Sequence, residues 1–171
     1  MGGGGPSLPE PVKHRDMAAT CTGLPPQGSA IPDVPDGVCK SDADCTDGDN
    51  GRCIWPYSGD NICIYDECFE DADCGGANVC ACRVKEAFGV NVCYHGNCQL
   101  DADCGAGGYC SPSGIVGPTC TMGIGAGSVG YFCHTAQDEC TDDADCGGES
   151  YVCLFSVDAA HWVCQELLCF G

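Results

Sequence analysis

The sequence predicts a small disulfide-rich protein of tandem cysteine-rich repeats, made of short β-hairpins and turns with little regular helix. Three observations lead to this fold class: 20 cysteines in 171 residues, a shortage of aliphatic side chains, and a cysteine motif that recurs four times. Cysteine at this density is typical of domains that fold in an oxidising compartment and depend on disulfides.

The hydrophobic residues are too few for an ordinary core. Leu, Ile, Val and Phe together make up about 17% of the chain, and the formal net charge is -19. A chain of this composition does not normally bury enough apolar surface to offset the entropy cost of ordering. Each disulfide typically contributes about 2–4 kcal/mol. We therefore expect disulfides to provide most of the stability.

From Cys39 onward the chain consists of four units that open with Cys-x-x-Asp-Ala-Asp-Cys. The units are residues 39–68, 68–98, 98–140 and 140–169, and the opening cysteine pairs are Cys39 and Cys45, Cys68 and Cys74, Cys98 and Cys104, and Cys140 and Cys146. The third cysteines are Cys53, Cys80, Cys110 and Cys153, and the fourth are assigned as Cys63, Cys93, Cys120 and Cys164.

Four cysteines fall outside this pattern, namely Cys21, Cys82, Cys133 and Cys169. The even total allows all 20 cysteines to pair, and four cysteines alone allow three connectivities. We expect the first cysteine of a unit to bond the third and the second to bond the fourth, with the remaining four forming two further bridges.

Each unit is predicted to be a capped helical turn followed by a hairpin. Acidic residues after Ser41 and Thr141 favour the start of a helical turn. Residues 52–55 and 61–65, and again 151–155 and 161–164, read as paired strands. The third unit is lengthened by Gly123, Gly125, Gly127 and Gly130, which we expect to form an exposed loop.

The first 38 residues differ in composition from the rest. Seven of the ten prolines lie before residue 38, after the glycine run 2–5. This composition predicts a flexible leader or tether, pinned to the repeats at one point by Cys21.

The charge excludes two classes of partner. The chain has only six Lys and Arg residues, which form no run. Nucleic-acid binding requires a basic stripe, and an anionic membrane surface would repel this chain. No apolar stretch approaches the length that spans a bilayer.

The repeated C-x-x-D-A-D-C opening resembles the cysteine-rich repeats of myxobacterial secreted proteins and lipoproteins, and the resemblance covers residues 39–171. It implies a secreted or outer-membrane location. The glycine-rich leader is similar to a lipoprotein tether, which implies that Met1 stands in the place of a lipidated cysteine. Membrane attachment is expected only through such an N-terminal lipid anchor, absent from this chain.

A weaker resemblance is to the N-terminal cysteine-rich domain of Dickkopf proteins, carried by the spacing of Cys39, Asp42 and Cys45. That family's Asn-x-Ile motif is absent and its basic cluster is reduced to Arg83 and Lys85. Wnt-pathway antagonism is therefore not carried over.

The aspartates of the motif have two interpretations. Capping of a turn by the first aspartate of each motif, through its own backbone, is favoured. The alternative is calcium, for which Asp42, Asp44, Asp47 and Asp49 offer hard oxygen ligands. This stretch does not fit the EF-hand pattern, since Asp47 occupies the glycine position.

Other cofactors and catalysis have little support in the sequence. Zinc is disfavoured because there is no C-x-x-C and the four histidines are isolated. Cys80-Ala81-Cys82 is read as providing an additional structural bridge in preference to a redox pair. There is no G-x-S-x-G, and we expect no enzymatic activity and no cofactor.

Binding is the remaining class. Trp55 and Tyr57 lie at a predicted hairpin tip, where they either cover the disulfides, which is favoured, or contact a partner. Trp162 is expected to pack on a disulfide. The sequence thus predicts a non-enzymatic extracytoplasmic scaffold that acts as an interaction or structural module towards a protein or cell-surface partner. The alternative is a calcium-dependent surface or adhesion module.

Overall fold

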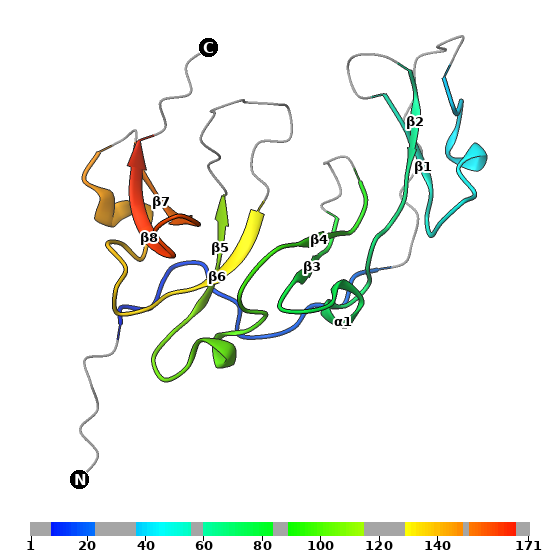
Figure 1. Ribbon diagram of the computed structural model, residues 1–171. Helices are drawn as coiled ribbons and strands as arrows, with labels where there is room; N and C mark the ends of the chain where they lie inside the picture. Colours follow the sequence, from blue (N-terminus) through cyan, green and yellow to red (C-terminus); the bar gives the residue numbers. More distant parts are fainter. Residues whose placement is uncertain are drawn as a thin grey trace. The chain divides into compact units, whose positions relative to one another are not determined.

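Four two-stranded hairpins follow one another along the chain in the computed structural model (Figure 1). The structure describes residues 8–22, 37–55, 60–83, 89–114, 129–148 and 151–166. The elements are η1 (Asp42–Asp44), β1 (Arg52–Ile54), β2 (Ile62–Ile64), α1 (Asp71–Cys74), β3 (Val79–Ala81), β4 (Val92–Tyr94), η2 (Asp101–Cys104), β5 (Cys110–Gly114), β6 (Val129–Cys133), η3 (Asp143–Cys146), β7 (Tyr151–Ser156) and β8 (His161–Glu166). The predicted fold class is confirmed.

Each hairpin is preceded by a helical turn of three or four residues that contains the Asp-Ala-Asp sequence. In three repeats a glycine with positive φ follows the turn, as at Gly75 and Gly105. Glycine adopts this conformation without steric cost, so the turn ends there and the chain can reverse into the first strand. Thr46 stands at this place in the first repeat, where the turn is one residue shorter.

The hairpin register sets the third cysteine of a repeat opposite the fourth. Cys53 lies opposite Cys63 in β1–β2, and Cys153 lies opposite Cys164 in β7–β8. Residues directly opposite each other in an antiparallel pair have their side chains on the same face. The two disulfides of a repeat can therefore anchor one face of the hairpin to the preceding turn.

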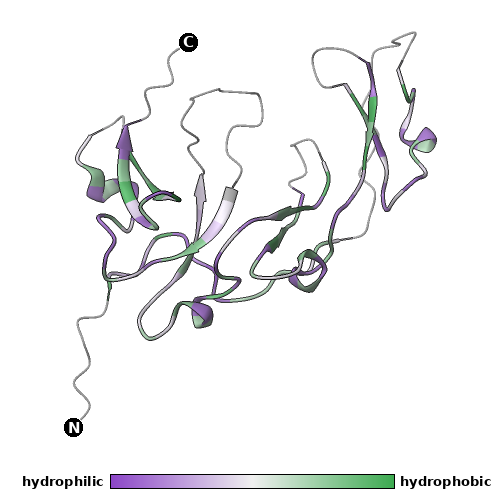
Figure 2. Cartoon of the chain, viewed as in Figure 1, coloured by the Kyte–Doolittle hydropathy of each residue, from purple (hydrophilic) through white to green (hydrophobic). Residues whose placement is uncertain are grey.

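The chain divides into two compact units. One comprises residues 19–76 and 80–93, and the other comprises residues 1–18, 77–79 and 94–171. The first contains the first two hairpins' disulfide clusters, in which Cys39, Cys45 and Cys53 pack with Tyr65, and Cys21, Cys68 and Cys80 pack with Cys74 and Cys93. Figure 2 shows hydrophobic and hydrophilic residues alternating in short stretches along the chain.

The second unit has an aromatic core in addition to its disulfides. Phe132 and Trp162 are buried with the cysteines of the fourth repeat, and Phe155 packs against them. Phe132 and Phe155 stack with their ring centroids 4.0 Å apart. This core joins the third and fourth repeats, since the backbone N–H of Phe155 also donates to the Ser113 hydroxyl of β5 at 2.7 Å.

One predicted feature of the third repeat is wrong. Gly130 lies in β6 and is buried, not in an exposed loop. A Cβ atom at this position would lie 2.4 Å from the Phe132 ring and 2.7 Å from the His95 carbonyl oxygen, so the strand requires glycine there. Gly123, Gly125 and Gly127 lie outside the described residues.

Candidate functional site

The disulfide framework is the dominant chemical feature of the molecule. Three repeats show the expected connectivity of first cysteine to third and second to fourth. The pairs are Cys39–Cys53 and Cys45–Cys63, Cys68–Cys80 and Cys74–Cys93, and Cys140–Cys153 and Cys146–Cys164. The same turn and hairpin are thus stapled twice in each of these repeats.

The third repeat departs from the expected assignment of its fourth cysteine. Cys98 bonds Cys110 as expected, but Cys104 bonds Cys133 and not Cys120. The register explains why, because Cys133 lies opposite Cys110 across the hairpin, where the other repeats place their fourth cysteine. The strand-like run Tyr131-Phe-Cys133 was the signal that could have identified it. Cys120 and Cys169 lie outside the described residues.

A ninth disulfide joins the leader to the second repeat. Cys82 bonds Cys21 across 61 residues, while its near neighbour Cys80 bonds Cys68. Cys80 and Cys82 therefore belong to different bridges. The alternative that these two cysteines form a redox pair with each other is wrong. Cys82 provides an additional structural bridge, as expected.

The second aspartate of each motif holds the turn. In all four repeats its Oδ2 atom accepts hydrogen bonds from the two backbone N–H groups three and four residues before it; for Asp73 the donors are Phe69 and Glu70, at 2.8 and 3.1 Å. Such bonds favour the charged carboxylate. The pKa values of Asp44, Asp73 and Asp103 are accordingly lowered, chiefly by these backbone donors. The pKa of Asp145 is lowered first by the Thr141 hydroxyl.

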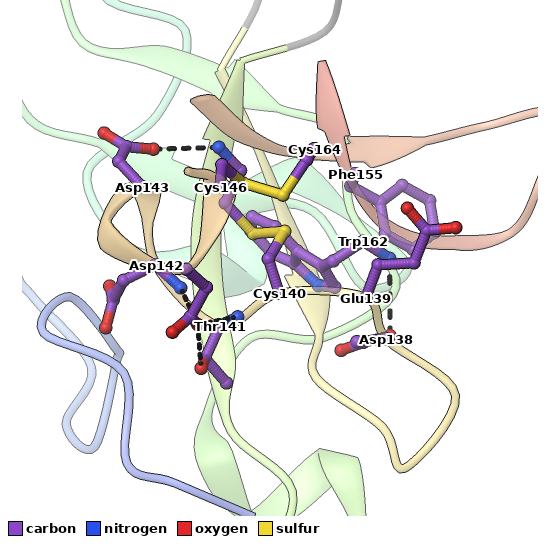
Figure 3. The surroundings of a disulfide bond; sticks show 12 residues. Asp138, Glu139, Cys140, Thr141, Asp142, Asp143, Cys146, Phe155, Trp162 and Cys164 are labelled. Carbon is purple, nitrogen blue, oxygen red and sulfur yellow. Dashed lines mark hydrogen bonds between the residues drawn. A yellow bond between two sulfur atoms is a disulfide. The ribbon is translucent and has the colours of Figure 1, made fainter. Parts of the chain in front are cut away.

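The first aspartate of each motif ties the turn to the hairpin. Its Oδ1 atom accepts the backbone N–H of the third cysteine in every repeat, for example Cys80 to Asp71 at 3.0 Å and Cys153 to Asp143 at 2.9 Å. Figure 3 shows this bond at Asp143 beside the two disulfides of the fourth repeat. The expected cap formed by the first aspartate through its own turn is therefore wrong; the second aspartate has that role.

The aspartates proposed for calcium do not gather into a cluster. The carboxylates of Asp42 and Asp44 accept hydrogen bonds from backbone N–H groups of their own repeat. Asp47 donates its backbone N–H to the Tyr65 hydroxyl, and the backbone carbonyl of Asp49 accepts from the N–H of Asp66. A metal site needs several ligand atoms close together. Among the described residues, three or more ligand atoms of Asp, Glu, His or Cys lie within 4.8 Å of one another only where all of them are cysteine sulfurs, as at Cys39, Cys45 and Cys63. All of these sulfurs are in disulfides, and metals bind the thiolate form, so metal ligation there would require reduction.

The leader contacts the repeats at more points than its disulfide. Arg15 is buried; its backbone N–H donates to the Cys110 carbonyl at 2.8 Å, and its guanidinium lies over the Tyr131 ring. The His14 imidazole lies 2.7 Å from an Asp101 carboxylate oxygen, which raises the pKa of His14. Residues 12–16 line a shallow cavity of about 470 Å³ together with Pro112 and Tyr131. His14 and Arg15 of the leader are thus packed against residues of the third repeat.

Three exposed apolar side chains lie on or next to the first hairpin. Trp55 follows β1 and is 37% exposed, and Ile62 of β2 is 39% exposed. Val38 is 74% exposed and donates its backbone N–H to the carbonyl of Asn61, next to Ile62. These three residues lie at the same end of the β1–β2 hairpin. Tyr57, the other candidate contact, lies outside the described residues.

Trp162, in contrast, is a core residue. It is 2% exposed and packs with Cys140, Cys146 and Cys153, which confirms the expected packing on a disulfide. Its indole Nε1–H donates to the Cys133 carbonyl at 3.1 Å, and its ring stacks on His134. Figure 3 shows Trp162 between the sulfur atoms and Phe155.

Comparisons with known proteins found no relatives. No family model matches the chain, and neither a curated protein nor a solved structure matches it. The two resemblances noted in the sequence therefore stay predictions. None of the helices in the described part of the chain has the length and hydrophobicity needed to span a membrane.

Proposed function

We propose that this chain is a non-enzymatic extracytoplasmic scaffold, which holds its hairpins in fixed local geometry and presents them to a protein or cell-surface partner. The observation that carries the proposal is the pairing of every described cysteine in one of nine disulfides. Disulfides at this density form and persist in oxidising compartments such as the extracellular space and the periplasm.

The role of the acidic residues supports a scaffold more than a catalyst. The most regular polar groups in the chain, the four Asp-Ala-Asp pairs, have their carboxylates bonded to backbone N–H groups of the turn and of the third cysteine. A carboxylate used in this way fixes local structure. The pattern is the same in all four repeats, as expected of a repeated structural module.

The first hairpin supplies the proposed contact with a partner. Trp is one of the residues in which binding hot spots are enriched, and Trp55 is exposed at the same end of the hairpin as the aliphatic residues Val38 and Ile62. The chain has a net charge of -19. A partner that pairs aromatic or aliphatic side chains with a basic rim would complement this end of the hairpin.

Fractionation of the producing cells tests the location. Free thiols are blocked in acid at lysis, and the protein is recovered from medium, envelope and cytoplasm for intact-mass analysis without reductant. We expect it in the medium or the envelope with no blocked thiol. Recovery of a reduced, thiol-labelled protein from the cytoplasm would overturn the proposal.

Binding of the purified, fluorescently labelled protein to intact producing cells tests the contact surface. Trp55→Ser should reduce binding, whereas Val157→Ser, which replaces an exposed valine of the fourth repeat, should leave it unchanged. Equal binding by the two variants would exclude the first hairpin as the contact surface.

A further inference from the structure

The disulfide between Cys21 and Cys82 differs from the other eight. It is the one described bridge outside the pattern of two per repeat, and it closes the longest loop, with a sequence separation of 61 residues. Cys82 directly follows β3, and Cys21 belongs to the leader. The bridge therefore joins the leader to a hairpin that already has two disulfides of its own.

The exposure of its two cysteines is unequal. Cys82 is the only exposed cysteine among the described residues, whereas Cys21 is 5% exposed. Thiol–disulfide exchange begins with attack of a thiolate on an accessible disulfide sulfur. The bridge is therefore more open to an external thiol on its Cys82 side than on its Cys21 side, and attack on the Cys82 sulfur makes Cys21 the leaving group.

The Cys21 sulfur touches a second disulfide. Its Sγ atom lies 3.6 Å from the Sγ atom of Cys80, which is bonded to Cys68. Cys68 and Cys80 are each 2% exposed, so an external thiol does not reach them directly. A thiolate formed at Cys21 would be in van der Waals contact with the sulfur that it must attack.

A cation lies beside the exposed bridge. The Arg83 side chain, next to Cys82 in sequence, donates to the carbonyl of Thr22, next to Cys21, at 3.0 Å. It also pairs with Asp66 at 3.2 Å, which offsets part of its charge. Cations near a sulfur favour the thiolate form, and a local cation attracts an incoming thiolate to a chain of net charge -19.

We propose that the Cys21–Cys82 bridge is a thiol-exchange site that accepts an external thiol at Cys82 and passes the exchange inward to Cys68–Cys80. In the first step the external thiolate bonds the Cys82 sulfur, the Cys21–Cys82 bond breaks, and its electron pair leaves on Cys21. In the second step the Cys21 thiolate bonds the Cys80 sulfur, the Cys68–Cys80 bond breaks, and Cys68 takes the electron pair and then a proton from solvent.

The relay gives the mixed disulfide at Cys82 a longer life. In a simple exchange the released Cys21 thiolate would attack Cys82 again and expel the external thiol. Here Cys21 is consumed by Cys80, so the leader stays bonded to the second repeat while Cys82 carries the thiol. The substrate class is a thiol of low molecular weight or a protein cysteine, and the activity goes beyond presentation of a surface.

The test uses reduced glutathione and the intact oxidised chain under anaerobic, mildly alkaline conditions. Thiols are trapped with an alkylating reagent in acid, and disulfide-linked peptides are mapped after pepsin digestion without reductant. We expect one glutathione on Cys82, one alkylated thiol on Cys68, and a new Cys21–Cys80 linkage. The remaining described bridges should be unchanged.

Paired variants identify the steps. Cys21→Ser with Cys82→Ser should abolish glutathione uptake, whereas Cys39→Ser with Cys53→Ser, the equivalent of the Cys68–Cys80 pair in the first repeat, should not affect uptake at Cys82. Cys68→Ser with Cys80→Ser should place the alkylated thiol on Cys21. Retention of the other bridges in each map shows that the variant has folded.

Arg83 is tested by the rate of glutathione uptake at low ionic strength. Arg83→Gln should slow uptake, and Arg83→Lys should restore it. Lys40→Gln, which removes an exposed cation of the first repeat, is the matched control and should have no effect. Uptake first at another cysteine, or an alkylated Cys21 beside an intact Cys68–Cys80 bond in the unmodified chain, would overturn the proposal.

Discussion

The two compact units of this protein use the same repeat but bury different material. In the unit of residues 19–76 and 80–93, the buried apolar residues that the structure describes are all cysteines. The other unit adds Phe132 and Trp162 to its buried cysteines, with Phe155 stacked on Phe132. In the first unit the fully buried apolar side chains that the structure describes are thus all in disulfides, with the Tyr65 ring partly buried against them, whereas the second unit combines disulfides with an aromatic core.

The difference between the two units separates the contacts that the repeat motif specifies from those that it does not. The turn, its two aspartates and the two bridges recur in each repeat and hold each hairpin individually. Contact between the third and fourth repeats instead comes from side chains that the motif does not specify, such as Phe132. The bridges act mainly by restricting the unfolded chain, while the rings stabilise the folded state through burial.

The largest expected effect is loss of the aromatic core. Trp162→Ala removes a side chain that is 2% exposed and bonded to the Cys133 carbonyl. Large-to-small changes of buried aromatic residues typically cost about 3–5 kcal/mol of unfolding free energy. Hydrogen exchange followed by mass spectrometry should show loss of protection in residues 94–166 and none in residues 37–55. Trp55→Ala, at an exposed position, is the control and should change stability by less than about 1 kcal/mol; an equal loss in both variants would contradict the comparison.

Removal of one bridge from each unit should have the next largest effect. Cys39→Ser with Cys53→Ser, and Cys140→Ser with Cys153→Ser, delete the equivalent disulfide from the first and the fourth repeat. Each deletion should cost about 2–4 kcal/mol. The first hairpin should lose its exchange protection, because its Tyr65 ring is only partly buried against the disulfides, whereas the fourth hairpin, supported by the buried Trp162 ring, should keep part of its own. Similar loss of protection in both hairpins would show that the aromatic core does not support the fourth repeat.

A smaller effect is expected for the first aspartate of the motif. Asp71→Ala leaves the N–H of Cys80, a residue 2% exposed, without its acceptor, and an unsatisfied buried donor costs about 1–3 kcal/mol. Asp143→Ala in the fourth repeat is the matched change at an exposed aspartate, so its cost should be lower. Urea unfolding of the two variants measures the difference. A larger loss of unfolding free energy for Asp143→Ala would mean that burial of the aspartate does not set the strength of its hydrogen bond to the third cysteine.

Acidification should have the smallest and most evenly distributed effect. The pKa values of Asp44, Asp73, Asp103 and Asp145 are lowered from 3.8 in the folded chain by hydrogen bonds. A depressed folded pKa contributes stability that is present above the unfolded value and is lost as the pH falls through the folded one. The Tm should therefore fall below about pH 4, in thermal unfolding followed by circular dichroism.

The second unit should be slightly more sensitive to acid. The pKa of Asp138 is also lowered, since its bonds to His134 and to two backbone N–H groups outweigh the effect of burial. Replacement of Asp138 by Asn should remove this additional sensitivity. If the Tm does not change below about pH 4, the charged carboxylates do not stabilise either unit.

The sequence by itself determined the class of the protein and the local plan of each repeat. Cysteine density with few aliphatic residues leaves disulfides as the main source of stability, and four openings of the same pattern favour four similar local structures. The hairpins β1–β2 and β7–β8 and the pairing within three repeats followed from that local pattern. Local spacing is sufficient here because the bonded cysteines of these repeats are 12 to 19 residues apart.

Only the tertiary structure decided the long-range features. Cys104 pairs with Cys133 because strand register, not order along the chain, places that cysteine opposite Cys110. The partner of Cys21 and the packing of Arg15 depend on where the leader runs over the repeats, which its composition does not encode. The two aspartates of the motif differ in role because one faces its own turn and the other faces the hairpin. The direction in which each aspartate side chain points is set only when the turn packs against the hairpin, and residue spacing alone does not predict it.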